Sequence, residues 1–188
     1  MSIDKGSITG HFIAHWGVPT NIRPRQVNPF GDFAILEFAP KGDRTSWRYA
    51  TNGMSSKTQL TDEGGSVRTE LYTCSRQRLP WVDDLLVAMA TYPFLNDTYL
   101  SEFDTIDAQQ AIDQKASPYT GILLAPPGPS DPETLGLAGK PGEDVLIHQV
   151  VGLLPNELEC ASRGGARDLW KKLLGEGEPA LDRVRSSH

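Results

Sequence analysis

The stretch LPWVDDLLVAMATY, residues 79–92, decides the fold, because it is the clearest helical segment in a chain that begins with strand-like patterns. Four of its apolar residues stand at i, i+3, i+4 and i+7, the positions that share one face of a helix: Val82, Leu85, Leu86 and Met89. Pro80 suits the start of a helix. The sequence therefore predicts one amphipathic helix near the middle of the chain.

The limits of this helix are also predicted by its residues. Asp83 and Asp84 fall in the first turn, where carboxylates interact favourably with the helix dipole. Pro93 disfavours helical geometry in the residue before it, so we expect the helix to end near Thr91 or Tyr92.

Three strands are predicted before the helix. Residues 31–40 alternate with apolar side chains on both faces, which is typical of a strand covered on two sides. Residues 45–55 form a second strand that ends at the Asn52-Gly53 pair, a strong turn signal because both residues tolerate positive φ. Residues 66–74 form a third, and the polar segment between the second and third reads as an exposed loop.

Two further strands and then two helices are predicted after this helix. Residues 119–126 form a short apolar run, and residues 144–155 are apolar on both faces, which indicates a central strand. A helix capped by Asn156 is expected over 156–165, ending at its double glycine. A second helix follows over 166–174.

This order predicts an α+β fold, with a twisted, mixed and largely antiparallel sheet flanked by helices. A single domain is expected over residues 1–174, followed by a weakly ordered tail over 175–188. The Pro- and Gly-rich segment 126–144 is a long loop of the kind that is usually functional or disordered.

Composition narrows the function classes. The net charge of −6 argues against a general nucleic-acid binder, which would present a basic face. Neither a secretory signal nor an apolar run of about 20 residues is present, so we expect a cytoplasmic protein that does not span a membrane. Cys74 and Cys160 form neither a disulfide framework nor a zinc spacing, and we expect no metal and no cofactor.

Signals for catalysis are weak. His11 and His15 could share a helix face as metal ligands, but the Glu of a zinc protease is missing. His148 could pair with Cys74 or Cys160 as base and nucleophile, although a buried, hydrogen-bonded histidine explains His148 better. Neither a phosphate-binding loop nor a G-x-S-x-G elbow occurs. A small enzyme of unknown reaction remains one alternative.

The span from residue 79 to 114 contains no Lys, Arg or His but seven acidic residues. It therefore predicts an acidic surface for a basic partner, with an ordinary solvated rim as the competing interpretation. Seven residues are the candidate partner-binding set: Asp83, Asp84, Tyr92, Asp97, Tyr99, Glu102 and Asp104.

Five segments, in order, carry a family resemblance: SWRYATNGMSS, RTELYTC, PWVDDLLVAMATYPFLNDTYL, YTGILLAPP and HQVVGLLPNELECASRGGARDLWKKL. Together they span roughly residues 34–174 and resemble suppressor-of-fused-like domain proteins. The resemblance implies an α+β domain with a twisted mixed sheet flanked by helices. It also implies that Tyr92 closes the helix at a recurring aromatic position, that Asp97 lies in the polar turn after it, and that Asp104 occupies an acidic position.

The same resemblance implies a non-enzymatic protein-binding role. Animal members of the family add a C-terminal domain and hold a transcription-factor peptide between the two domains, and we expect this chain to lack that second domain. Bacterial single-domain members resemble immunity proteins that neutralise a toxin. We therefore expect a protein partner, such as a basic toxin, rather than a nucleic acid or a membrane.

A second binding mode is also open. An exposed edge strand can take a partner peptide as an additional strand, and GILLAPP, residues 121–127, is the candidate edge. The sequence leaves open whether the protein is an immunity protein, a peptide-binding regulator or a small enzyme, and it predicts no oligomeric state.

Overall fold

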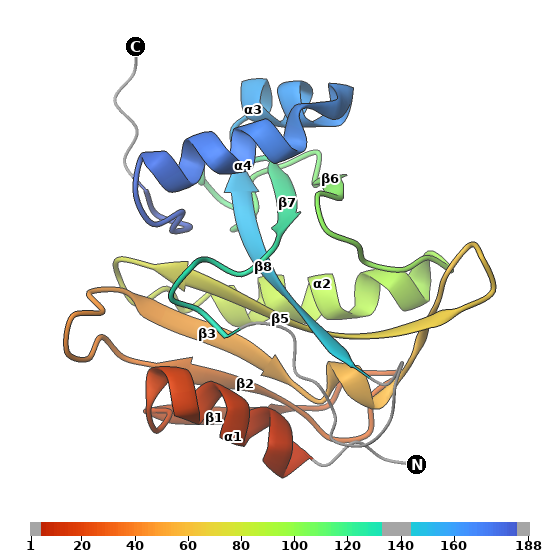
Figure 1. The fold of residues 1–188 in the computed structure, drawn as a ribbon, viewed down its shortest axis with the longest axis vertical. Helices are drawn as coiled ribbons and strands as arrows, with labels where there is room; N and C mark the ends of the chain where they lie inside the picture. The colour runs from red at the N-terminus through yellow and green to blue at the C-terminus, as the bar shows by residue number, and fades with distance from the viewer. Residues whose placement is uncertain (1–4, 133–143, 184–188) are drawn as a thin grey trace.

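The computed structural model describes residues 5–132 and 144–183 and shows a long sheet with helices packed against it (Figure 1). The helices are α1 Lys5–Trp16, α2 Val82–Leu95, α3 Pro155–Cys160 and α4 Ala166–Gly175. The strands are β1 Asn21–Arg25, β2 Phe33–Phe38, β3 Trp47–Asn52, β4 Gln59–Leu60, β5 Ser66–Ser75, β6 Thr105–Asp107, β7 Gly121–Ala125 and β8 Val145–Leu153.

The sheet has the strand order β1-β2-β3-β5-β8-β7-β6, and β4 pairs separately with β5. Every pair is antiparallel except β5 with β8, which run parallel. The predicted α+β class with a mixed, largely antiparallel sheet is therefore confirmed. The single parallel pair arises because the chain passes through α2, β6 and β7 before β8 returns beside β5.

Helices cover both faces of the sheet (Figure 1). On one face α2 packs through Val82, Leu86 and Met89 onto the largest apolar cluster, which includes Ile35 and Leu71. On the other face α1 buries Ile8, Phe12 and Trp16, and α4 covers the end of β7 and β8. The two-sided burial of the strands over 33–38 and 145–153, expected from their apolar faces, follows from this arrangement.

The turn after β3 depends on glycine, as the Asn52-Gly53 pair predicts. Gly53 has φ +118°, and a Cβ at this position would lie 2.4 Å from the backbone oxygen of Asp32. The turn continues into a short 3-10 helix, Met54–Ser56, which lies against β5. Only glycine fits this close approach of two backbone segments.

The predicted end of α2 is wrong, because the helix continues through Pro93 to Leu95. Pro93 is buried, and the next residue, Phe94, packs edge-on against Phe30 with ring centroids 5.3 Å apart. A proline in the last turn removes one backbone hydrogen bond, and burial of these side chains offsets that cost.

The helix near the C-terminus also begins differently from the prediction. α3 starts at Pro155, and the Leu154 N–H donates to the Glu157 carboxylate at 2.9 Å, so Asn156 is not its cap. Proline is favoured at the first helical position because its missing N–H would have no partner there. Gly164, with φ +95°, ends this helical segment as expected from the double glycine.

The segment after α4 lies against the sheet, although the sequence predicts a weakly ordered tail from residue 175. Ala180 and Leu181 are buried, and the Leu181 N–H donates to the Cys74 carbonyl at 2.8 Å. Of the predicted loop 126–144, residues 133–143 lie outside the described residues, and Asp131 just before them is buried. Within the described ranges, every helix is too short or too polar to cross a membrane.

Candidate protein-binding surface

The loop that joins α2 to β6 is held at several points along its length. Leu100 is buried, and its N–H donates to Gln59 Oε1 at 2.8 Å. Further along, the Phe103 N–H donates to the Leu124 carbonyl at 2.7 Å, and the Leu124 N–H donates to the Asp104 carbonyl at 2.9 Å. The loop over 96–104 is therefore attached both to β4 and to β7.

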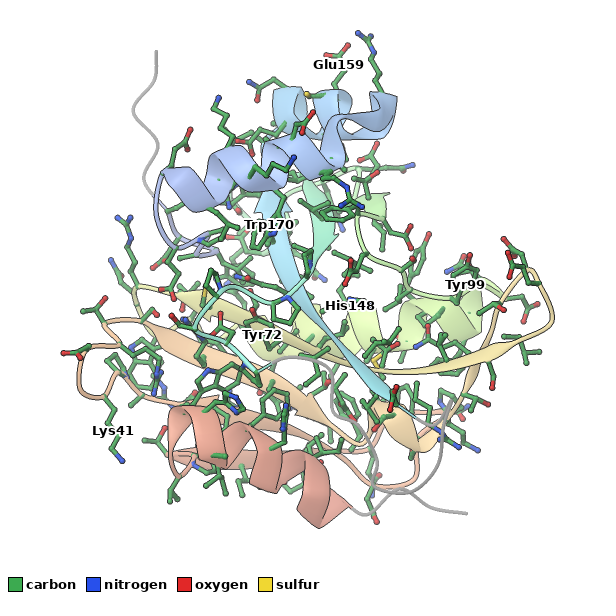
Figure 2. The ribbon with its side chains drawn as sticks, in the orientation of Figure 1. Lys41, Tyr72, Tyr99, His148, Glu159 and Trp170 are labelled. Atoms are coloured by element: carbon green, nitrogen blue, oxygen red, sulfur yellow. The ribbon has the colours of Figure 1, made fainter. Side chains whose placement is uncertain are left out.

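Two acidic and two aromatic side chains stand on this frame. Asp97 and Glu102 are exposed, and Tyr92 and Tyr99 are half-buried. Figure 2 shows Tyr99 at the end of α2, on the side of the β4–β5 turn. Asp97 has φ +47°, a left-handed conformation that Asp tolerates better than most residues. The loop thus presents charges beside the half-buried Tyr99, and Tyr92 at the end of α2 packs against the core.

Asp104 occupies an intermediate position in the same loop. Its side chain is half-buried, and its Oδ2 accepts a hydrogen bond from the Ser101 N–H at 2.8 Å. Burial raises the pKa of the Asp104 carboxyl, and the hydrogen bond from Ser101 opposes that effect. Asp104 therefore shapes the loop as well as contributing charge to it.

Asp83 lies inside the protein. It is 1% exposed, and its carboxylate accepts hydrogen bonds from Arg23 at 2.5 and 2.6 Å and from Arg25 at 2.6 Å. Arg23 also donates to the buried Glu37 at 2.5 Å. Asp83 thus ties the start of α2 to the edge strand β1, and it cannot meet a partner as the sequence predicts.

Asp84 is exposed, but it lies at the other end of α2 from Asp97. A helix of 14 residues is about 21 Å long, so these two carboxylates do not belong to one compact patch. The other five predicted residues lie in the last turn of α2 and in the loop that follows it. We define the acidic loop surface as Tyr92, Asp97, Tyr99, Glu102 and Asp104.

The structure adds residues that no local sequence pattern indicates. Through the Gln59–Leu100 hydrogen bond, the β4–β5 turn lies beside the loop, and it carries the exposed residues Asp62 and Glu63. Leu60 and Leu95 are 73% and 79% exposed, the two most apolar side chains of this region left in solvent. A strand of two residues has no recognisable alternation, which is why β4 was missed.

A cation also reaches the loop. The Arg167 guanidinium on α4 lies over the Phe103 ring, 4.6 Å from its centroid. The absence of basic residues from the span 79–114 in the sequence therefore does not make the folded surface free of positive charge.

The Cys–His pairs that the sequence allows do not form. The side chain of Cys74, like that of Tyr72, lies on the α1 face of the sheet, and its Sγ lies 3.4 Å from Gln149 Nε2. Because side chains alternate along a strand, the side chain of His148 lies on the opposite face, which α2 covers. Cys160 is exposed on α3. Cys74 and His148 are both buried, so the enzyme alternative based on these three side chains loses its geometric basis.

The burial of His148 indicates a structural role for this side chain. It is 2% exposed, and desolvation lowers its pKa to about 4. Neither ring nitrogen has a hydrogen-bond partner among the described residues, so the histidine is buried as predicted but not hydrogen-bonded. His11 and His15 do lie next to each other along α1, with ring centroids 5.0 Å apart and ring planes tilted by 59°, and the His15 ring nitrogen Nδ1 lies 3.0 Å from the His11 carbonyl oxygen. In the described ranges, no three residues of the His, Cys, Asp and Glu types are grouped as metal ligands.

The strand proposed for peptide addition is not an edge. β7 lies between β6 and β8, and all five of its residues are buried. Its second side is occupied because Thr105–Asp107 pairs with it as β6, a strand that the sequence did not reveal. The actual ends of the sheet are β1 and β6, so the prediction of an exposed edge at residues 121–127 is wrong.

Comparisons with known proteins agree with this fold. A family model described as suppressor of fused protein (SUFU) matches residues 32–184. A chain in the Sufu–Fu complex crystal structure is similar, with 22% identity and a TM-score of 0.72, covering 96% of this chain and 90% of that chain. A putative SUFU homolog from Neisseria gonorrhoeae FA 1090 has 16% identity and a TM-score of 0.70, covering 97% and 95%.

Drosophila Suppressor of Fused shares 23% identity and a TM-score of 0.60, covering 84% of this chain but 43% of that chain. This chain therefore spans less than half of the Drosophila chain. No curated protein sequence matches it. Because the family model covers most of the chain and the fold is the same, the protein belongs to the suppressor of fused family.

Proposed function

We propose that this protein is a non-enzymatic protein-binding module that acts in the cytoplasm by sequestering or neutralising a protein partner. One observation carries the proposal: the chain belongs to the suppressor of fused family, and a similar chain was solved in a complex, that of Sufu with Fu. The alignment with that chain extends over 96% of this one, so the whole fold is shared.

The acidic loop surface is the part of the molecule best suited to the partner. Asp97 and Glu102 are exposed, and Asp62 and Glu63 of the β4–β5 turn add negative charge beside them. A surface of this sign attracts a basic partner and raises its association rate. A basic toxin is such a partner, and an immunity-type role is the finer form of the proposal.

Rigidity and aromatic content support the same surface. Backbone hydrogen bonds from Leu100 and Phe103 hold the loop, so less conformational entropy would be lost on binding. Half-buried tyrosines such as Tyr92 and Tyr99 resemble the aromatic anchors of protein interfaces. The exposed Leu95 and Leu60 offer apolar contact area at the edge of the charges.

Affinity capture with matched charge reversals tests the proposal. The purified protein is used to retain partners from cells of its natural host, and the retained protein is then produced separately and mixed with it. We expect the double variant Asp97→Lys/Glu102→Lys to lose most of this binding, because repulsion replaces attraction at the contact.

The control is Glu159→Lys/Asp168→Lys, which changes the net charge equally on the exposed faces of α3 and α4. Figure 2 shows Glu159 at the end of the molecule away from Tyr99. Equal binding by the two double variants would mean that the acidic loop surface is only a solvated rim. A partner whose activity is unchanged when bound would count against neutralisation.

A further inference from the structure

A second feature lies on the face of the sheet opposite α2. A hollow of about 670 Å³ opens between the end of α1 and the turn that joins β2 to β3. Its lining includes Trp16 and Gly17 at the end of α1, residues 41–45 of the turn, and Arg48 of β3. Its volume falls within the range of about 300–1,000 Å³ that is usual for ligand sites.

The cationic side chains of this hollow differ in whether a carboxylate lies beside them. Arg48 is already paired, since its guanidinium donates to Asp131 at 3.1 Å and to Glu178. Arg44 donates instead to three neutral carbonyl oxygens, those of Ser46 at 2.8 Å, Ala39 at 2.7 Å and Trp16 at 3.2 Å.

Among the described residues, Lys41 has no matching carboxylate either. Within the part of the chain that the structure describes, no salt bridge joins Lys41 or Arg44 to an acidic side chain. The Trp16 carbonyl belongs to the last turn of α1, so Arg44 also offsets the negative end of that helix. The unmatched charges of the hollow are therefore the Lys41 ammonium and part of the Arg44 guanidinium.

The backbone that carries both cations is held by hydrogen bonds. Lys41 and Arg44 form an isolated β-bridge, with N–H to carbonyl distances of 3.0 and 3.2 Å in the two directions. The three hydrogen bonds of Arg44 use three of the five guanidinium N–H donors, so two remain for a ligand. Burial and the nearby charge of Arg48 lower the pKa of Arg44, and the carboxylates of Glu178 and Asp131 offset this effect only in part.

The acidic residues around the hollow limit which anion fits. Asp43 is exposed in the turn itself, and Glu178 lines the hollow beside Arg48. Their charges repel a phosphate dianion more strongly than a single carboxylate. The planar guanidinium of Arg44 also matches a carboxylate well. Lys41 lies at the outer end of the β2–β3 hairpin (Figure 2), so a ligand chain can continue into solvent.

We propose that this hollow, formed by Trp16, Gly17, Lys41, Arg44 and Arg48, is a carboxylate subsite that takes an Asp, Glu or C-terminal carboxylate of an acidic peptide segment. The peptide as the source of the carboxylate rests on the proposed protein-binding function, whereas the carboxylate chemistry rests on the hollow alone. The subsite lies on the face opposite α2, so it is separate from the acidic loop surface.

Titration followed by amide NMR tests the proposal. The probes are the acetylated peptide Gly-Ser-Gly-Asp-Glu with a free C-terminus, the acetylated and C-terminally amidated peptide Gly-Ser-Gly-Asn-Gln, sodium acetate and inorganic phosphate. We expect the acidic peptide to shift the amide signals of Gly17, Gly42 and Arg44 in a saturable way. The neutral peptide should leave them in place.

A pair of lysine variants provides the control. Lys41→Glu should weaken binding of the acidic peptide by about fivefold or more, the effect of about 1 kcal/mol of charge interaction. Lys171→Glu, the same change on the exposed face of α4, should bind like the unaltered protein. The remaining amide signals of each variant verify that it is folded.

Three results would overturn the proposal. If neither acetate nor the acidic peptide produces saturable shifts, the hollow is not a carboxylate subsite. Equal weakening by Lys41→Glu and Lys171→Glu shows a general charge effect. If phosphate or acetate binds as tightly as the acidic peptide, the hollow binds a free anion and not a peptide segment. Partner capture by the acidic loop surface is measured separately, so either proposal can fail without the other.

Discussion

Glu70 and Ser55 join two segments that lie 15 residues apart in the sequence: the buried Glu70 carboxylate accepts hydrogen bonds from the Ser55 N–H at 3.0 Å and the Ser55 hydroxyl at 2.6 Å. The same carboxylate accepts from the Gly53 N–H at 3.0 Å and the Thr51 hydroxyl at 2.5 Å. The turn after β3 is thus built around a side chain of β5. The segments TNGMSS and RTEL are therefore in direct contact in the fold.

Replacing Glu70 by Ala should destabilise the fold by about 3 kcal/mol or more, because several buried donors lose their acceptor at about 1–3 kcal/mol each. Urea unfolding measures the change. Glu63→Ala, an exposed acidic residue on the β4–β5 turn, should change stability by no more than about 0.5 kcal/mol. A similar small loss for both variants would show that the Glu70 hydrogen bonds are not important to the turn.

The neighbours Asp83 and Asp84 should differ sharply in their effect on stability. Asp83→Asn leaves Arg23 and Arg25 without their buried carboxylate, and breaking such a pair costs about 3–5 kcal/mol. Asp84→Asn removes an exposed charge and should cost about 0.5 kcal/mol or less. Urea unfolding of the two variants compares them directly, and equal values would contradict the burial of Asp83.

Acid should weaken the fold through His148. Its pKa is about 4 in the folded protein and 6.5 in the unfolded chain, so between these values the unfolded chain binds the proton more readily. This contribution to stability is complete above about pH 6.5 and is lost as the pH falls toward 4, by about 3 kcal/mol.

The measurement is the free energy of unfolding of the unaltered protein and of His148→Gln between pH 4 and 7. The variant should lack this part of the pH dependence, whereas His15→Gln, at an exposed position, should retain it. Parallel curves for the unaltered protein and His148→Gln would mean that His148 is not buried in its neutral form.

The two cysteines should react with a thiol reagent at very different rates. Cys160 is exposed, whereas Cys74 is buried, and burial raises the pKa of its thiol. In native buffer, a disulfide reagent such as dithionitrobenzoate should modify one thiol promptly and the second only after denaturation. In Cys160→Ser the prompt reaction should disappear. A fast reaction of Cys74 in the native variant would place it in an accessible, activated site.

Elements with strong internal patterns could be predicted from the sequence. The strands over 33–38, 66–75 and 145–153 carry apolar residues on both faces, and α2 carries a regular apolar stripe. By contrast, β1 has the sequence NIRPR, and three-residue β6 has no apolar alternation. Their positions are determined by pairing with β2 and β7, which is long-range information.

The candidate surface was predictable only in part for the same reason. Local sequence shows that Asp83 and Asp84 are both acidic and adjacent, but the arginines that bury Asp83 are 58 and 60 residues away. The aromatic and acidic residues after α2 are predicted from the acid-only span and the family resemblance, and their role in binding remains a prediction. The boundary of the domain at residue 174 remains a prediction, although Leu181 packs into the α2-face core.

The association rate constant between this protein and its captured partner tests the central claim most directly. It is measured by stopped flow from about 0.01 to 1 M salt, a range in which the Debye length falls from about 30 to 3 Å. We predict a steep decrease with salt and, at low salt, at least about tenfold slower association for Asp97→Lys/Glu102→Lys than for Glu159→Lys/Asp168→Lys. An association rate indifferent to salt and equal in the two variants would contradict the account.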